Sequence, residues 1–164
     1  MATNPDFDKI KLAFDALSNA DHSTHEEALE YLGYCEKNPQ FIFMLLEIYE
    51  KSDNLQHRMA ATINILEIVK GIAKVSYRRK QKYGIKKFLI FVDKMFNSEQ
   101  LSTLRQKLVS YLVSELNSSL RSSIETAVII LARFSFPTHF EEFYKYMTQL
   151  LTNLGKQIKV KIAI

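Results

Sequence analysis

The side chains with the widest chemical scope in this sequence are four histidines, His22, His25, His57 and His139, and a single cysteine, Cys35. Histidine can ligate a metal or act as a general base near neutral pH, and a thiolate can do both. His22 and His25 are close enough in sequence to share a metal, but no third ligand follows at a fixed spacing. A single cysteine cannot form an internal disulfide, which favours a reducing compartment. We therefore predict surface histidines and no metal site.

Other catalytic motifs are not recognisable in the sequence. A nucleophile elbow or a phosphate-binding loop needs glycines at turn positions, and the chain has only four glycines and three prolines. So few turn residues also argue against a fold with many hairpins or βα turns. We expect neither catalytic residues nor a cofactor, so the sequence favours a helical binding protein over an enzyme.

Positive charge is concentrated in one segment of the chain. The sequence has 22 basic and 18 acidic residues, a net charge of +4. The basic residues that we call the basic window lie close together with no acid between them: Arg78, Arg79, Lys80, Lys82, Lys86 and Lys87. The rest of the chain is slightly acidic. A uniformly basic nucleic-acid binder is therefore not expected.

The basic window is open to several interpretations. We favour a solvated connection between helices, because runs of charged residues between helices are usually exposed to solvent. Tyr77 precedes its cations and Tyr83 lies among them, a combination that would suit RNA backbone contacts and base stacking. A nuclear localisation signal or an intramolecular plug for an acidic groove would also fit the segment. The sequence also predicts an acidic helix face, which consists of Glu26, Glu27, Glu30 and Glu36. This face is either simply exposed to solvent or attracts a basic partner.

Neither a membrane span nor a signal peptide is predicted. No stretch reaches the roughly 18 apolar residues of a transmembrane helix. The first eleven residues carry four charges, where a signal peptide needs an apolar run. With 164 residues, 47% of them apolar, the chain can form one compact domain or a short repeat array. We expect an intracellular protein.

Capping residues and apolar periodicity predict a succession of helices. Leu29 and Ile63 are expected among the core-facing residues of the second and fourth of them. A further apolar helix is expected within 83–96, around Phe88 to Val92. The predicted segments are 6–18, 24–37, a helix after Pro39 that includes 41–46, 54 to about 75, a helix from 98, one that includes 124–134, and 138–154.

These helices fall into pairs that begin near residues 6, 39, 98 and 138. Such spacing indicates an all-α fold of HEAT-type helical hairpin repeats that form the start of an α-solenoid. The repeats would cover 1–154, with an insertion at about 78–96, and an unpatterned tail would follow at 155–164. Because the last hairpin of a solenoid normally packs on another repeat, we expect the start of a longer array or a truncated product.

Several segments resemble the importin-β family of nuclear transport receptors, and the branch of importin eleven is the most similar. Arg58-Met59-Ala60-Ala61 resembles the arginine and alanine pattern of the family's second hairpin. Leu104-Arg105, the stretch 127–133 and Phe136-Pro137-Thr138-His139-Phe140-Glu141-Glu142-Phe143 resemble its third hairpin and the run into the fourth. The chain departs from the family at Leu66-Glu67, where Lys-Asn is frequent.

The resemblance implies a receptor that binds the GTP-bound form of the small GTPase Ran through the inner helices of its first repeats. It also implies protein cargo and nuclear pore proteins as partners, import in preference to export, and a place in the nucleus, the cytoplasm and the nuclear envelope. By linkage, Ran can release cargo only if the two ligands compete for one surface or favour different curvatures.

The surface that the resemblance points to is the polar side of the second helix in each pair. We therefore take as candidate partner-binding residues Arg58, Asn64, Glu67, Lys70 and Glu125. Only Arg58 lies within a matched motif, and an arginine that braces the neighbouring hairpin is an equal alternative. The competing function is a small helical-repeat scaffold that binds RNA or protein through the basic window and has no GTPase role.

Overall fold

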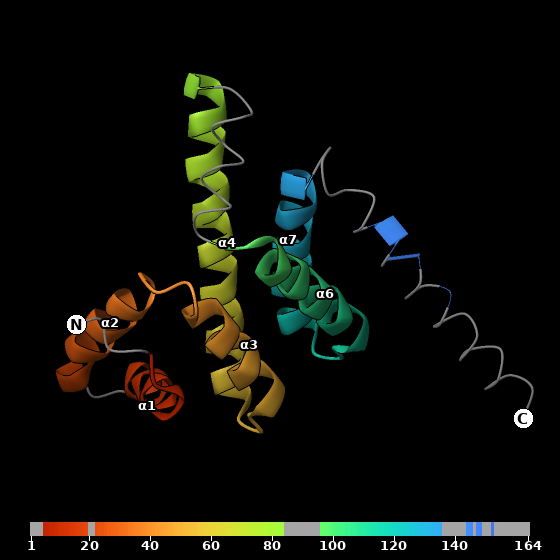
Figure 1. Ribbon diagram of the computed structural model, residues 1–164. Coiled ribbons are helices and arrows are strands. Elements are labelled where there is room, and N and C mark those ends of the chain that lie inside the picture. Colours follow the sequence, from red (N-terminus) through yellow and green to blue (C-terminus); the bar gives the residue numbers. More distant parts are fainter. Residues whose placement is uncertain are drawn as a thin grey trace, which may run out of the picture. The chain divides into compact units, whose positions relative to one another are not determined.

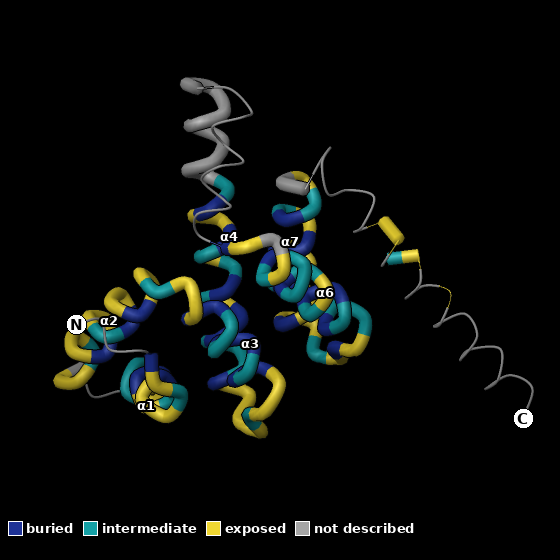
Figure 2. Tube along the Cα trace, in the orientation of Figure 1, coloured by how far each residue is buried: buried dark blue, intermediate teal, exposed yellow. Residues whose placement is uncertain are grey.

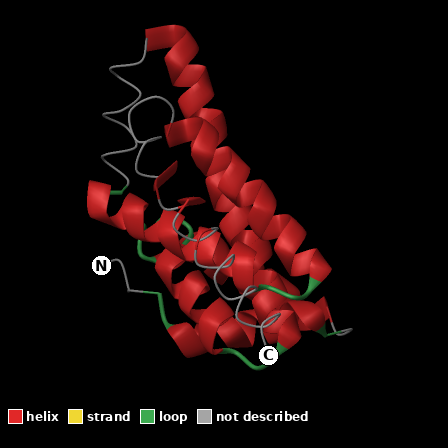
Figure 3. Ribbon diagram, turned by 90° about the vertical axis from the view of Figure 1, so that its right-hand side faces the viewer, coloured by secondary structure: helices red, strands yellow, loops and turns green. Residues whose placement is uncertain are grey.

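The computed structural model describes residues 5–19, 22–83, 96–135, 144–145, 147–148 and 152. Side chains are described over the same residues, apart from those at 22, 74–83, 98 and 134–135. Throughout this part of the chain the elements are helices joined by loops, as the sequence predicts (Figures 1 and 3). The chain divides into two compact units, residues 1–97 and 98–164. Each unit is described by itself.

The first unit is built from two helical hairpins. The helix α1 packs against α2, and α3 packs against α4, while α1 also contacts both α3 and α4. The elements are α1 (Phe7–Ser18), the 3-10 turn η1 (His22–Thr24), α2 (His25–Cys35), α3 (Phe41–Lys51) and α4 (Leu55–Tyr83). The predicted pairing of consecutive helices is therefore confirmed in this unit.

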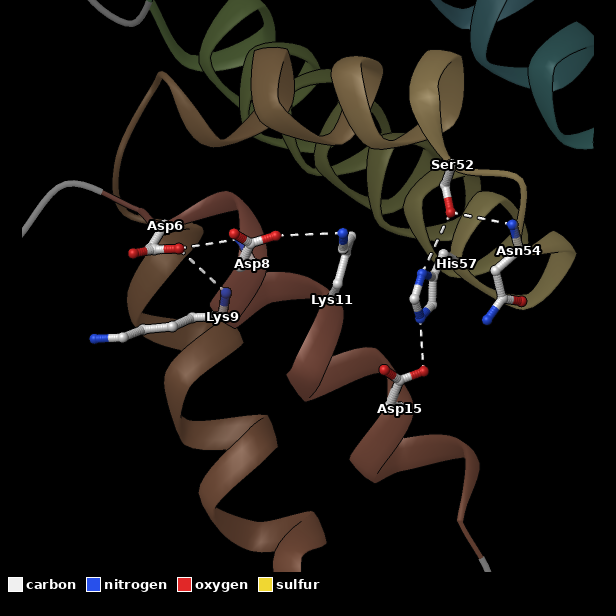
Figure 4. Close-up of polar contacts among 8 residues, drawn as sticks. All are labelled: Asp6, Asp8, Lys9, Lys11, Asp15, Ser52, Asn54 and His57. Carbon is white, nitrogen blue, oxygen red and sulfur yellow. Dashed lines mark hydrogen bonds and ion pairs between the residues drawn. The ribbon is translucent and has the colours of Figure 1, made fainter.

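Local hydrogen bonds explain where these helices begin. The Asp6 carboxylate accepts hydrogen bonds from the backbone N–H groups of Asp8, at 3.0 Å, and Lys9, at 3.2 Å (Figure 4). The Asn54 side chain accepts one from the N–H of Gln56, at 2.9 Å. Each side chain satisfies a donor that the first turn of a helix leaves without an intrahelical partner. The first and fourth helices thus begin within a residue of the predicted positions.

The core of the first unit lies where the hairpins meet. Helix α3 is apolar on nearly all sides and is buried accordingly, as predicted (Figure 2). The α4 side chains that meet it recur at spacings of three and four, the pattern of one helical face. The buried apolar side chains are Ile10, Ala13 and Phe14 of α1, Ala28, Leu32 and Cys35 of α2, Phe41, Ile42, Leu45, Leu46, Ile48 and Tyr49 of α3, and Ala61, Ile65, Val69 and Ile72 of α4.

Three expectations about this unit are wrong. Helix α4 extends to Tyr83 and does not stop near Val75, so it continues well past the end of α3 in Figure 1. Ile63 is 52% exposed, because it lies on the opposite side of α4 from the stripe that meets α3. Leu29 of α2 is 60% exposed, because it falls beside the stripe formed by Ala28 and Leu32.

The second unit contains a third hairpin, formed by α6 (Ser98–Ser114) and α7 (Ser118–Ser135). Asn117 begins α7, since its side chain accepts hydrogen bonds from the N–H groups of Ser119 and Leu120, at 3.0 and 3.1 Å. Buried apolar residues face each other across the pair: Leu101, Leu104, Leu108, Val109 and Tyr111 of α6, and Leu120, Ile124, Ala127, Val128 and Leu131 of α7. The apolar stretch 88–92 lies outside the described residues. The expected hairpin after 138 is described only at residues 144–145, 147–148 and 152, which are helical.

Gly71 of α4 gives a direct test of the helical assignment. A Cβ atom at this position would meet no atom within 4 Å, so alanine fits without strain. Alanine also loses less backbone entropy on folding, and Gly71→Ala should stabilise the first unit by about 0.5–1 kcal/mol in urea unfolding. Gly33→Ala in α2 has equally open surroundings and should act alike. A loss of stability in both variants would contradict the helical environment.

Tyr31 and Cys35 on α2 should make the first unit sensitive to alkali. Burial raises the pKa of the Tyr31 hydroxyl above its ordinary 10.0 and the pKa of the Cys35 thiol above 9.0. A raised pKa favours the protonated folded state, so this stability is complete below the unfolded pKa values and is lost as pH rises through the folded ones. We expect the urea midpoint to fall between about pH 8 and pH 11.

The matched control for this expectation lies on the same helix. Tyr31→Phe should reduce the alkaline loss because it removes one of the titrating groups. Tyr34→Phe, at a side chain that is 38% exposed, should leave the loss unchanged. An identical alkaline profile for Tyr31→Phe and the unaltered chain would show that Tyr31 does not contribute.

Candidate partner-binding surface

The side of α4 that faces away from α3 carries two of the predicted site residues, Glu67 and Lys70. Ala61, Ile65, Val69 and Ile72 bury one face of the helix, so residues half a turn away reach solvent. We define the α4 outer surface by its exposed residues: Gln56, Ile63, Glu67, Lys70 and Gly71. It combines one large apolar side chain with polar and charged neighbours.

Glu67 and Lys70 form an ion pair on this surface. Lys70 Nζ lies 2.7 Å from Glu67 Oε1. The Lys70 side chain is 46% exposed and the Glu67 side chain is 59% exposed. An exposed pair of this kind contributes little to stability, on the order of 0–1 kcal/mol. Both side chains therefore remain free to exchange this contact for one with a partner.

Asn64 lies at the margin of the α4 outer surface and is half-buried. Its Nδ2 donates a hydrogen bond to the carbonyl oxygen of Ala60, at 2.8 Å, one turn back along the helix. One of its two N–H donors is thus already engaged with the backbone. Glu125 is exposed on α7 and belongs to the other unit.

Arg58 does not belong to the α4 outer surface. It is nine residues from Glu67, about two and a half turns, so the two side chains point to opposite sides of α4. The Arg58 guanidinium lies 4.8 Å from the centre of the Tyr49 ring on α3, a cation–π contact within the hairpin. The structure therefore gives Arg58 a bracing contact inside its own hairpin and does not bring it together with Glu67 and Lys70.

The basic window is only partly described. Arg78, Arg79, Lys80 and Lys82 lie within the helical span of α4, and their side chains lie outside the description, as do Lys86 and Lys87 entirely. The expectation of a plain connection is wrong for the first four, because the helix continues through them.

Two of the histidines have described side chains, and neither is fully exposed. His57 is only 8% exposed, so the prediction of surface histidines is wrong for this residue. Its Nε2 lies 2.6 Å from Asp15 Oδ1 on α1, and its Nδ1 lies 3.3 Å from Ser52 Oγ in the α3–α4 connection (Figure 4). His25 is half-buried, with Nε2 3.0 Å from the carbonyl oxygen of Asn19. His22 and His139 have no described side chains.

Sequence reasoning missed the contact of His57 with Asp15 and Ser52. Asp15 and His57 are 42 residues apart, and only the packing of α1 against α4 brings them together. The spacing of five residues from Ser52 to His57 across a helix start was the only local signal.

Neither a metal cluster nor a membrane span is found within the described ranges. They contain no group of three or more histidine, cysteine, aspartate or glutamate side chains that could hold a metal ion. None of the helices, as far as they are described, is long and apolar enough to cross a membrane. Comparison of the chain with protein-family models, curated proteins and solved structures gives no match.

Proposed function

We propose that this chain is a helical-repeat receptor of the importin-β type, which binds the GTP-bound form of Ran through the α4 outer surface. Protein cargo and nuclear pore proteins are its further partners, and it works between the nucleus and the cytoplasm. The proposal is supported by the resemblance of residues 58–61, 104–105, 127–133 and 136–143 to that family and by the packing of the helices in consecutive pairs.

The observation that carries the proposal is the exposure of Ile63 on a second helix. At 52% exposure, Ile63 offers an apolar centre, and Gln56, Glu67 and Lys70 surround it with polar groups. Protein interfaces commonly combine a buried apolar centre with a polar rim. Glu67 and Lys70 neutralise each other, so this pair would not attract a charged partner over a distance. The exposed carboxylates of α2 would attract a basic surface of the partner instead: Glu26, Glu27 and Glu30.

Direct binding tests the proposal. The full chain is titrated with Ran loaded with GTP or with GDP, and tight binding is expected for the GTP form only. Ile63→Arg should weaken that binding by about tenfold or more, because it places a charge at the centre of the interface. Leu12→Arg is the matched control, since Leu12 is 66% exposed on α1, outside the α4 outer surface. Equal binding of both nucleotide forms, or an unaffected Ile63→Arg variant, would overturn the proposal.

One observation favours a second candidate function, a scaffold that binds RNA. Because α4 continues to Tyr83, Arg78, Arg79, Lys80 and Lys82 occupy one continuous helix and not a loose connection. Cations fixed along a helix can contact successive phosphates, and such binding weakens steeply as salt is raised. Single-stranded RNA binding that disappears when these four residues are changed to alanine, without any preference for Ran in its GTP form, would favour this function over the first.

A further inference from the structure

Ser52, His57 and Asp15 form a hydrogen-bonded series that the proposed function does not use. Ser52 Oγ lies 3.3 Å from His57 Nδ1, and His57 Nε2 lies 2.6 Å from Asp15 Oδ1. In Figure 4 the imidazole stands between the hydroxyl and the carboxylate. The His57 side chain is 10% exposed and the Asp15 side chain is 52% exposed, while Ser52 is half-buried.

The carboxylate sets the tautomer of the histidine. A carboxylate can only accept a hydrogen bond, so a neutral His57 carries its proton on Nε2 and donates it to Asp15. Nδ1 then has a free lone pair, and the Ser52 hydroxyl donates to it. A nucleophile within hydrogen-bond reach of a base, which a third group orients in turn, is the arrangement that activates serine hydroxyls.

The surroundings of Ser52 also suit attack on a carbonyl group. The N–H of Asn54 donates to Ser52 Oγ at 3.3 Å, and α4 begins directly after this connection, at Leu55. The start of a long helix carries a partial positive charge that would stabilise negative charge developing nearby. Asp53 is exposed beside Ser52, so an uncharged reagent is favoured over an anionic one.

We propose that Ser52 is a reactive serine that small, uncharged, activated esters acylate. In this step the Ser52 oxygen bonds to the ester carbonyl carbon, and the hydroxyl proton moves to His57 Nδ1. Asp15 stabilises the imidazolium that forms. The bond from the carbonyl carbon to the leaving oxygen then breaks, and the leaving group departs with the proton from His57. Water, with His57 as base, hydrolyses the acyl-serine and restores the hydroxyl.

Mass spectrometry after treatment with p-nitrophenyl acetate or a fluorophosphonate tests this proposal on the full chain. Peptide mapping should place the adduct on Ser52, where the rate should exceed the rate at Ser114 by about tenfold or more. Ser114 is the matched internal control, because it also lies at a helix end but its hydroxyl donates to the backbone carbonyl of Ser110, at 3.1 Å.

Variants decide whether His57 and Asp15 cause the reactivity. Ser52→Ala should abolish the adduct at this site, and His57→Gln should slow acylation of Ser52 by about tenfold or more. Asp15→Asn keeps an exposed side chain of the same shape and should slow it as well, which provides a test if His57→Gln fails to fold. No fluorophosphonate adduct on Ser52 in the folded chain, or an unchanged rate in Asp15→Asn, would overturn the proposal and leave the three residues with a structural role only. Neither outcome bears on the binding of Ran.

Discussion

Leu45→Ala is expected to lower the free energy of unfolding of the first unit by about 2–5 kcal/mol. Leu45 lies at the centre of α3 and is 0% exposed, among side chains contributed by its own helix and by α4. Removing three carbons there loses the free energy of burying them and leaves a cavity that the surrounding helices fill only in part. Urea unfolding followed by circular dichroism measures the change.

Leu12→Ala is the control for the same chemical change. Leu12 is 66% exposed on α1, so its truncation should alter the unfolding free energy by less than about 0.5 kcal/mol. Because the chain has two compact units, hydrogen exchange of the α3 amides should accompany the urea experiment and assign the loss to the first unit. Similar costs for Leu45→Ala and Leu12→Ala would show that α3 is not the buried centre of this unit.

The helices and their pairing were predictable because their signals are local. Asp6 and Asn54 each satisfy donors in the next turn, and most of the apolar side chains of α3 are buried. The end of α4 was not predictable in the same way. The sequence after Val75 loses its apolar periodicity and becomes basic, whereas the backbone stays helical as far as Tyr83. Arg and Lys are good helix formers and can extend a helix beyond its apolar stretch.

The candidate site shows a different limit. The position of Arg58 opposite Glu67 follows from nine residues of helical spacing, so it could have been read from the sequence once the stripe through Ala61 and Ile65 was placed. The exposure of Ile63 follows from the same spacing. The contact of His57 with Asp15 could not be read in this way, because it depends on where α1 meets α4 in space.

His57→Ala should destabilise the first unit by about 2–3 kcal/mol, the second large effect that we expect. His57 is 8% exposed and contacts both Asp15 on α1 and Ser52 in the α3–α4 connection. The substitution removes two hydrogen bonds and a buried ring, which leaves a cavity between the first and second hairpins. Urea unfolding of the variant and of the unaltered chain, at a pH near neutrality, gives the difference.

The two partners of this hydrogen bond should not be equivalent. Asp15→Ala leaves the Nε2–H of a buried imidazole without its acceptor and should cost about 1–2 kcal/mol, whereas the exposed Asp15 carboxylate left by His57→Ala is rehydrated. The double variant should therefore cost less than the sum of the single variants, by about 0.5–1 kcal/mol. Asp8→Ala is the control on the same helix, because its carboxylate is 81% exposed and pairs with Lys11 at 3.3 Å. Its effect should be near zero, and full additivity for His57 and Asp15 would show that their 2.6 Å contact does not hold α1 against α4.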